Sequence, residues 1–128
     1  MNIIQFPVER VVEINQTILM TEPGFRGEYD IGRLSGALSR IDNAIAYENL
    51  DDIFLIAAKY AASVAMAHAF SDANKRTGLA LCLEYLSLND YEISIECDEL
   101  SIAMVDLVVG TLCETEFADV LYSMWYSV

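Results

Sequence analysis

The segment from Ile53 to Phe70 constrains the fold more than any other part of this sequence. Lys59, Ser63 and His68 are its only strongly polar side chains. A lysine in the middle of a bilayer costs roughly 3 kcal/mol, and the many alanines of the segment gain little from lipid, so a membrane span is disfavoured. A helix that is apolar on nearly all sides belongs in the centre of a helical bundle. We therefore expect other helices to surround it.

The remaining segments repeat apolar residues at steps of three and four, the spacing of amphipathic helices. Polar or breaking residues separate these repeats, and several can cap a helix. The predicted helices run from Pro7 to Thr21, from a cap at Asp30 to Ile45, from Leu50 to Ala67 and between Asn74 and Asn89, with two more starting from caps at Asp98 and Thr115. A short extended piece is expected over Tyr91 to Cys97. The expected fold is all-α, a compact six-helix bundle with residues 1–128 as a single domain.

Charge and cysteine content exclude several classes of protein. Seven basic residues against twenty acidic residues give a net charge of −13, so broad contact with nucleic-acid phosphates would begin with repulsion. A general DNA or RNA binder is therefore not expected. The three cysteines form no C-x-x-C pair, which fits a reducing compartment. The first residues lack the basic start and apolar stretch of a secretory signal, so a cytoplasmic location is expected.

One short run gathers unusual chemistry between the two most apolar predicted helices. It contains the single histidine of the chain, His68, and two of its seven basic residues, Lys75 and Arg76. The basic residues open a helix, and a helix N-terminus with two cations is a ready anion site. Asp72 lies between His68 and the two basic residues in the sequence. A carboxylate beside a phosphate needs a divalent cation to bridge the two. The run therefore suggests a polyphosphate bound together with Mg²⁺.

Each of these residues also has an ordinary structural explanation. A single histidine at a helix end is more often a cap or a packed core residue. Asp72 or Asn74 could cap the following helix, and Lys75 and Arg76 could be solvated charges. Only the combination of a base, a metal ligand, an amide and two cations in one run favours a functional site.

The run HAFSDANKR resembles the signature H-x-F-x-[DE]-[AG]-N-[GK]-R of the Fic/Doc family. It is most similar to the Doc, or death-on-curing, toxin branch, in which a lysine replaces a glycine of the Fic loop. The resemblance extends to Gly24–Leu38, to Ala46-Tyr47-Glu48 and to Leu86–Tyr91. It covers most of residues 1 to about 120 and implies an all-helical fold.

For activity, the resemblance to Doc implies transfer of a phosphoryl group from ATP to a Ser or Thr hydroxyl of a target protein. Elongation factor Tu is a candidate target, and its modification would inhibit translation. The family also implies a toxin–antitoxin pair, with a small antitoxin protein whose disordered tail folds against the toxin, and no direct nucleic-acid or membrane partner. Two alternatives stay open: Fic-type transfer of AMP or another nucleotide, and a catalytically impaired protein that only binds a partner in a repressor complex.

By the same resemblance, His68 would be the base that activates the acceptor hydroxyl, and Asp72 would be the Mg²⁺ ligand. The phosphate and nucleotide ligands would be Asn74, Lys75, Arg76 and Thr77. We also expect the loop containing Tyr47 and Asn49 to dock the target segment, through strand-like edge pairing.

The sequence departs from the family pattern at two positions. Leu79 stands where Fic enzymes carry a second arginine, which argues against ordinary AMP transfer. Met66 stands where Doc relatives usually carry an arginine, so a phosphate or substrate contact could be missing. The chain also lacks the motif of a built-in inhibitory helix, and inhibition would then have to come from another protein.

Overall fold

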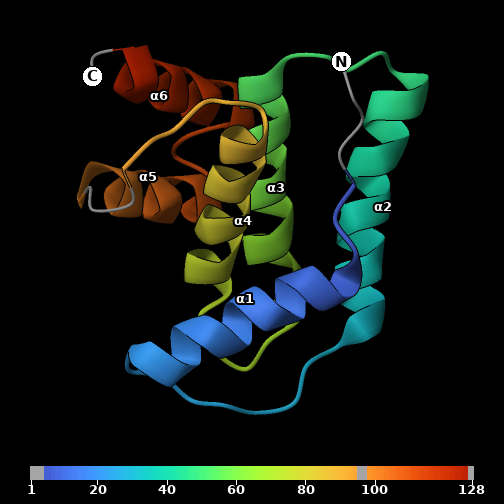
Figure 1. Ribbon diagram of the computed structural model, residues 1–128, viewed down its shortest axis with the longest axis vertical. Helices are drawn as coiled ribbons and strands as arrows, with labels where there is room; N and C mark the ends of the chain where they lie inside the picture. The colour runs from blue at the N-terminus through green and yellow to red at the C-terminus, as the bar shows by residue number, and fades with distance from the viewer. Residues whose placement is uncertain (1–4, 95–97, 127–128) are drawn as a thin grey trace.

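The computed structural model describes residues 5–94 and 98–126, and within these ranges it contains six helices (Figure 1). They are α1 (Val8–Thr21), α2 (Ile31–Tyr47), α3 (Ile53–Ala67), α4 (Asn74–Leu88), α5 (Asp98–Val109) and α6 (Glu114–Tyr126). The extended pairing among the described residues is a single isolated bridge between Tyr29 and Phe70. The all-α, six-helix prediction is confirmed.

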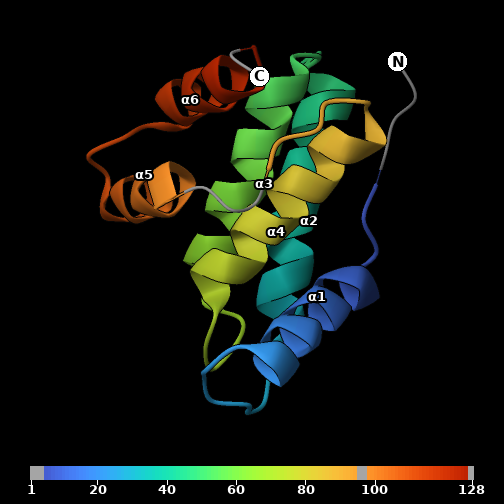
Figure 2. The same ribbon diagram turned by 60° about the vertical axis from the view of Figure 1, so that its left-hand side comes forward.

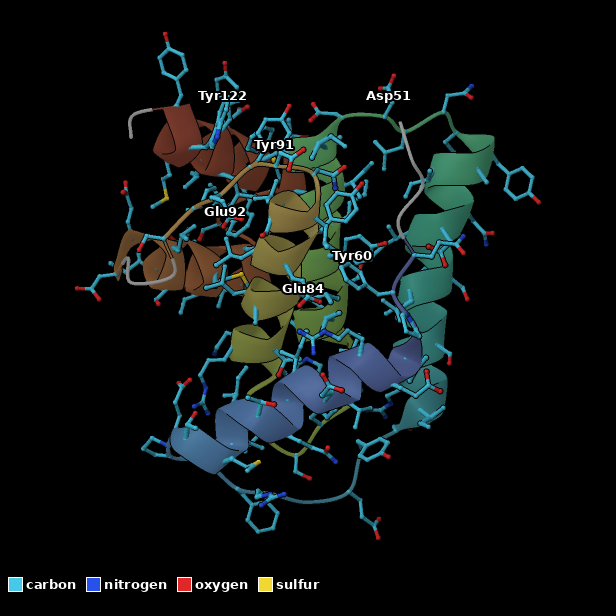
Figure 3. The ribbon with its side chains drawn as sticks, in the orientation of Figure 1. Asp51, Tyr60, Glu84, Tyr91, Glu92 and Tyr122 are labelled. Atoms are coloured by element: carbon cyan, nitrogen blue, oxygen red, sulfur yellow. The ribbon has the colours of Figure 1, made fainter. Side chains whose placement is uncertain are left out.

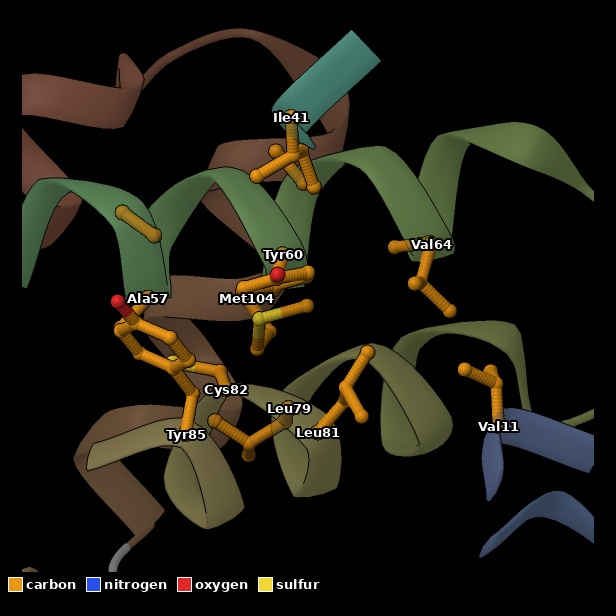
Figure 4. Packing of buried hydrophobic residues seen from close by; sticks show 14 of the residues in the cluster. Val11, Ile41, Ala57, Tyr60, Val64, Leu79, Leu81, Cys82, Tyr85 and Met104 are labelled. Atoms are coloured by element: carbon orange, nitrogen blue, oxygen red, sulfur yellow. The ribbon is translucent and has the colours of Figure 1, made fainter. Parts of the chain in front are cut away.

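Helix α3 lies at the centre of the bundle, as its apolar sequence predicts. It packs against α2, α4, α5 and α6, while α1 crosses α4 and α2 at one end of the molecule (Figures 1 and 2). Tyr60 of α3 and Tyr85 of α4 are both buried, with ring centroids 5.2 Å apart (Figure 4). Arg10 forms an ion pair with Glu84 (labelled in Figure 3), which ties α1 to α4.

Gly78 allows α3 and α4 to approach each other closely. A β-carbon at this position would lie 2.6 Å from the carbonyl oxygen of Ala61 and 3.2 Å from the amide nitrogen of Ala65. The two helix backbones are therefore in direct contact. This contact matters for the site because α3 ends at, and α4 begins from, the run identified in the sequence.

Side-chain caps fix the starts of α2 and α3. Asp30 accepts a hydrogen bond from the Arg33 amide at 3.0 Å, as predicted. Asp52 accepts hydrogen bonds from the amides of Phe54 and Leu55 at 3.0 and 3.1 Å, so α3 begins at Ile53 rather than at Leu50. The carboxylate that satisfies the free amides sets the boundary.

Three expectations for the C-terminal part need correction. Helix α5 begins at Asp98 itself, and Thr115 lies inside α6, which begins at Glu114. The Glu116 carboxylate accepts a hydrogen bond from the Cys113 amide at 2.9 Å, the pattern of a capping box that starts one residue before the helix. Residues 91–94 form no strand, and residues 95–97 of the expected extended piece lie outside the described residues.

Among the described helices, none has both the length and the hydrophobicity needed to cross a bilayer.

Candidate active site

The connection between α3 and α4, residues 68–73, lies at one end of the bundle (Figure 2). It begins and ends with a residue in the left-handed conformation: His68 has φ 49°, and Ala73 has φ 63°. Residues other than glycine rarely adopt this conformation, which costs of order 1–3 kcal/mol and concentrates at functional sites. The turn therefore keeps its shape through contacts with the surrounding structure.

Hydrogen bonds from Asn74 and Asn15 hold this turn in place. The Asn74 side chain accepts from the Phe70 amide at 3.1 Å and donates to the Phe70 carbonyl at 2.9 Å. Asn15, which is buried on α1, donates from Nδ2 to the Asp72 carbonyl at 3.0 Å. Asn74 thus shapes the loop with both ends of its amide.

The connection between α1 and α2, residues 22–30, is fastened across the same turn, and we call it the strap. The Phe25 amide donates to Asp72 Oδ2 at 2.9 Å, and the Asp30 amide donates to the Ala69 carbonyl at 2.7 Å. Ser71 Oγ donates to the Glu28 carbonyl at 3.1 Å. The main chain of the strap thus contacts the run directly.

Asp72 is held in its ionised form. Its Oδ1 accepts from the Ala73 amide at 2.7 Å, and its Oδ2 accepts from the Phe25 amide. These two backbone hydrogen bonds lower the pKa of Asp72, and the Arg76 guanidinium 3.8 Å away lowers it further. Each carboxylate oxygen keeps a lone pair beyond the hydrogen bond it accepts.

Two depressions meet at His68. The first has a volume of about 350 Å³ and is lined by His68, Ser71, Asp72, Ala73, Asn74, Lys75 and Arg76, together with Ala65 and Val108. The second has a volume of about 490 Å³ and is lined by residues 28–31 of the strap and α2 and by residues 68–71. His68 is exposed and borders both the polar cavity that contains the two cations and the open depression beside the strap.

The two cations of the first cavity differ in the contacts that their side chains make. Arg76 Nη1 donates to the Pro23 carbonyl at 3.0 Å and lies 3.4 Å from the Glu22 carboxylate, so the strap already occupies part of this guanidinium. Lys75 is exposed, and within the described part of the chain its ammonium forms no ion pair.

Thr77 does not reach this cavity. Its side chain is fully buried, its Oγ1 accepts from Asn15 Nδ2 at 3.0 Å, and its amide donates to the Ala73 carbonyl at 2.8 Å. The sequence-based assignment of Thr77 as a phosphate ligand is therefore corrected: this residue connects α4 to α1.

The structure also separates Tyr47 and Asn49 from His68. Both lie in or next to the connection that precedes α3, the connection that contains Asp51 (labelled in Figure 3), whereas His68 follows the other end of the helix. Helix α3 has 15 residues and is thus roughly 22 Å long. The expected docking loop lies far from the imidazole.

Sequence reasoning missed several residues that build the site. They are Asn15, the strap residues Glu22 and Phe25, and Arg33, whose Nη1 donates to the His68 carbonyl at 3.3 Å. A signal existed for Asn15, because it lies three and four positions after Val12 and Val11 on the apolar face of α1. A polar residue on a buried face usually has a specific partner.

The sequence of this chain matches a family model and a known protein. The sequence model of the Fic/DOC family matches residues 5–86, a range that contains the strap and the whole run from His68 to Arg76. The chain is also 29% identical over 119 residues to the protein kinase doc of Escherichia phage P1, covering 93% of this chain and 94% of that protein. The family match extends over more than half of the sequence, and the chain belongs to the Fic/DOC family.

Proposed function

We propose that this protein is a Doc-type protein kinase, which transfers the γ-phosphoryl group of ATP to a Ser or Thr hydroxyl of another protein. The observation that carries the proposal is the position of His68 between the two depressions. On one side, Asp72, Lys75 and Arg76 surround space for phosphates. On the other, the strap borders an open depression through which an acceptor hydroxyl could reach the same imidazole. The similarity to a protein named as a kinase supports the same reaction.

In the proposed reaction, a ring nitrogen of His68 accepts the proton of the acceptor hydroxyl as its oxygen bonds to the γ-phosphorus. The bond between the γ-phosphorus and the β–γ bridging oxygen breaks, and ADP leaves. Lys75, Arg76 and the N-terminus of α4 stabilise the negative charge on the transferred group. Asn74 contributes by holding the loop, since both polar atoms of its amide bond to Phe70.

The residues present fit a magnesium ion shared with the nucleotide. No group of three or more His, Cys, Asp or Glu side chains among the described residues could form a complete protein cage for a metal. Mg²⁺ is usually bound by one or two carboxylates together with phosphates and water, and Asp72 offers an ionised carboxylate in the cavity wall. The ion would supply charge neutralisation at the phosphates.

We extend the proposal to the biological role of a toxin in a toxin–antitoxin pair. The target would be a translation protein, with elongation factor Tu as the first candidate, and phosphorylation would inhibit translation. An antitoxin protein with a disordered tail would keep the activity in check. Family membership and the similarity to the phage protein support this role.

The activity test uses purified protein, magnesium and ATP labelled at the γ-phosphate, with cell extract or purified elongation factor Tu as the acceptor. We expect the wild type to label one polypeptide, and mass spectrometry to find a phosphoryl addition. An adenylyl addition would instead assign Fic-type nucleotide transfer. Lys75 and Leu79 favour the phosphoryl outcome through the resemblance to Doc.

His68→Ala is the decisive variant, because general base catalysis typically contributes 10²- to 10⁴-fold to a rate. We expect labelling to fall by at least about 100-fold in this variant. Tyr47→Ala is the matched control: its side chain is 82% exposed at the far end of α3, and labelling should stay at the wild-type level. Unchanged labelling by His68→Ala would reject the mechanism, and a large loss in Tyr47→Ala would restore the docking role expected from the sequence.

A further inference from the structure

The last basic residue in the sequence, Arg76, belongs to the candidate site. None of the seven Lys and Arg residues lies beyond Arg76, whereas ten of the twenty Asp and Glu residues do. Residues 77–128, which include most of α4 and all of α5 and α6, therefore carry −10 of the net charge of −13. Any surface on this part of the molecule is presented in a strongly negative field.

An apolar stripe lies on the outer face of α5 within this acidic part. Ile102, Val105 and Val109 are 63%, 47% and 66% exposed. At about 100° per residue they fall within an arc of roughly 60°. The residues that face the core, Leu100, Ala103, Met104 and Leu107, lie on the opposite side of the helix. The helix is thus apolar on two faces, and its own bundle covers only one of them.

Acidic side chains and a groove border this stripe. Asp98 lies in line with it at the start of α5, and Glu99 and Asp106 lie along one edge, seven positions apart. On the side of Glu99, a groove of about 440 Å³ is lined by that residue and by Asp119, Val120, Ser123 and Met124 of α6. The surface therefore combines an apolar seam with carboxylates along its edge.

Charge decides between the possible occupants. A second copy of this chain would bring two surfaces of the same sign together, and an anionic membrane would also be repelled. A helix with its own apolar seam and flanking lysines or arginines would satisfy both properties of the surface, because residues at helical spacing can dock along the stripe while cations face Glu99, Asp106 and Asp119.

We propose that the outer face of α5, with the α5–α6 groove, is the docking surface for a basic amphipathic helix of a partner protein. Val108 of the same helix lines the first cavity, the one that contains His68 and Lys75, so the docked segment would lie beside the candidate active site. This position suits a partner that controls the enzyme. The proposal rests on the proposed function only where the partner is identified as the antitoxin.

The test follows the backbone amide signals of isotope-labelled protein by NMR while synthetic peptides are added. One peptide carries leucines at positions i, i+3, i+4 and i+7 and lysines elsewhere, and the second has glutamate in place of every lysine. We expect the lysine peptide to shift signals of α5 and of the groove residues on α6, and the glutamate peptide to shift none. His68→Ala should leave binding unchanged, which separates this result from the outcome of the kinase test.

Matched variants make the test specific for the stripe. Ile102→Ser with Val109→Ser changes exposed residues only and should weaken binding of the lysine peptide at least about tenfold. The control, Met20→Ser with Leu88→Ser, removes apolar side chains that are 71% and 55% exposed elsewhere and should keep the wild-type affinity. Glu99→Gln with Asp119→Asn should weaken binding severalfold and reduce its dependence on salt.

Four results would overturn the proposal. Signals that shift over the whole acidic surface, or equal losses in the stripe variant and its control, would mean nonspecific attraction. Equal binding of the glutamate peptide would remove the role of charge. Sedimentation of the free protein as a dimer that the stripe variant disperses would assign this face to a second copy of the chain.

Discussion

At the scale of single residues, the run from His68 to Arg76 could be predicted because its members are neighbours in the sequence. The structure places most of them in the wall of one cavity. The residues that the prediction missed come from elsewhere in the chain. Glu22 and Pro23 carry no local signature of a contact with Arg76, since only the path of the strap between α1 and α2 brings them there. Thr77 was misassigned because helix geometry turns its side chain toward Asn15 and away from the cavity.

The contact between Glu22 and Arg76 predicts that the strap weakens nucleotide binding. The Glu22 carboxylate lies 3.4 Å from a guanidinium that the proposed function assigns to phosphate, so it both competes with the ligand and repels it. A single charge near the surface is worth about 1 kcal/mol or less, so Glu22→Gln should lower the Kd for ATP with magnesium roughly two- to fivefold. Titration calorimetry measures this directly.

Glutamine is chosen because its amide oxygen can still accept a hydrogen bond from Arg76, which preserves the position of the guanidinium. Glu48→Gln makes the same change of charge at the far end of α2 and should leave the Kd unchanged. Weaker binding in Glu22→Gln would show the reverse relation, in which the carboxylate holds Arg76 ready for the phosphate.

At the scale of helices, the spacing of apolar residues predicted all six elements, and the apolar character of α3 on nearly all sides predicted its central position. Boundaries were less accurate where a side chain outside the repeat sets the first turn. Asp52 starts α3 three residues later than its apolar pattern suggests, and Glu116 bonds back to Cys113 to start α6 before Thr115. Such caps compete with other polar residues nearby, and the sequence does not reveal which one reaches the free amides.

Replacement of glycine by alanine should have opposite effects on stability at Gly78, where α3 and α4 are in contact, and at Gly36 on α2. Gly78→Ala would place a methyl group 2.6 Å from the Ala61 carbonyl oxygen, and overpacking of this kind typically costs about 1–3 kcal/mol. At Gly36 the nearest atom to the new methyl group would be the end of the Arg40 side chain at 3.8 Å. Gly36→Ala should therefore stabilise the protein by about 0.5–1 kcal/mol through helix propensity.

Urea unfolding followed by circular dichroism gives both free energies of unfolding. Because α3 and α4 carry the two sides of the candidate site, Gly78→Ala should also lower the rate of phosphoryl transfer, whereas Gly36→Ala should not. Equal stabilisation of the two variants would mean that the helices can separate without cost, and the close packing at Gly78 would then have no role in holding the site.

At the scale of the whole molecule, the net charge of −13 made broad nucleic-acid binding unexpected, but it did not show how the charges are distributed. Lys59 of α3 pairs with Glu114 of α6 at 2.9 Å and brings one cation to the acidic C-terminal part. The structure was needed to show that Ile102, Val105 and Val109 face outward, because α5 is apolar on two opposite faces and its sequence does not indicate which of them is buried.

Self-repulsion among these charges should make the folded state sensitive to salt. Folding brings like charges closer together, and the Debye length falls from about 30 Å at 0.01 M to about 8 Å at 0.15 M ionic strength. The free energy of unfolding should therefore rise with sodium chloride over this range. Glu99→Gln with Asp119→Asn removes two exposed charges from the acidic part, so this variant should be more stable than the wild type at low salt and less dependent on salt. If the free energy of unfolding instead falls as salt is added, attractive ion pairs such as Arg10 with Glu84 outweigh the repulsion. The acidic charges would then not destabilise the free protein, and binding of a basic partner would relieve no repulsion.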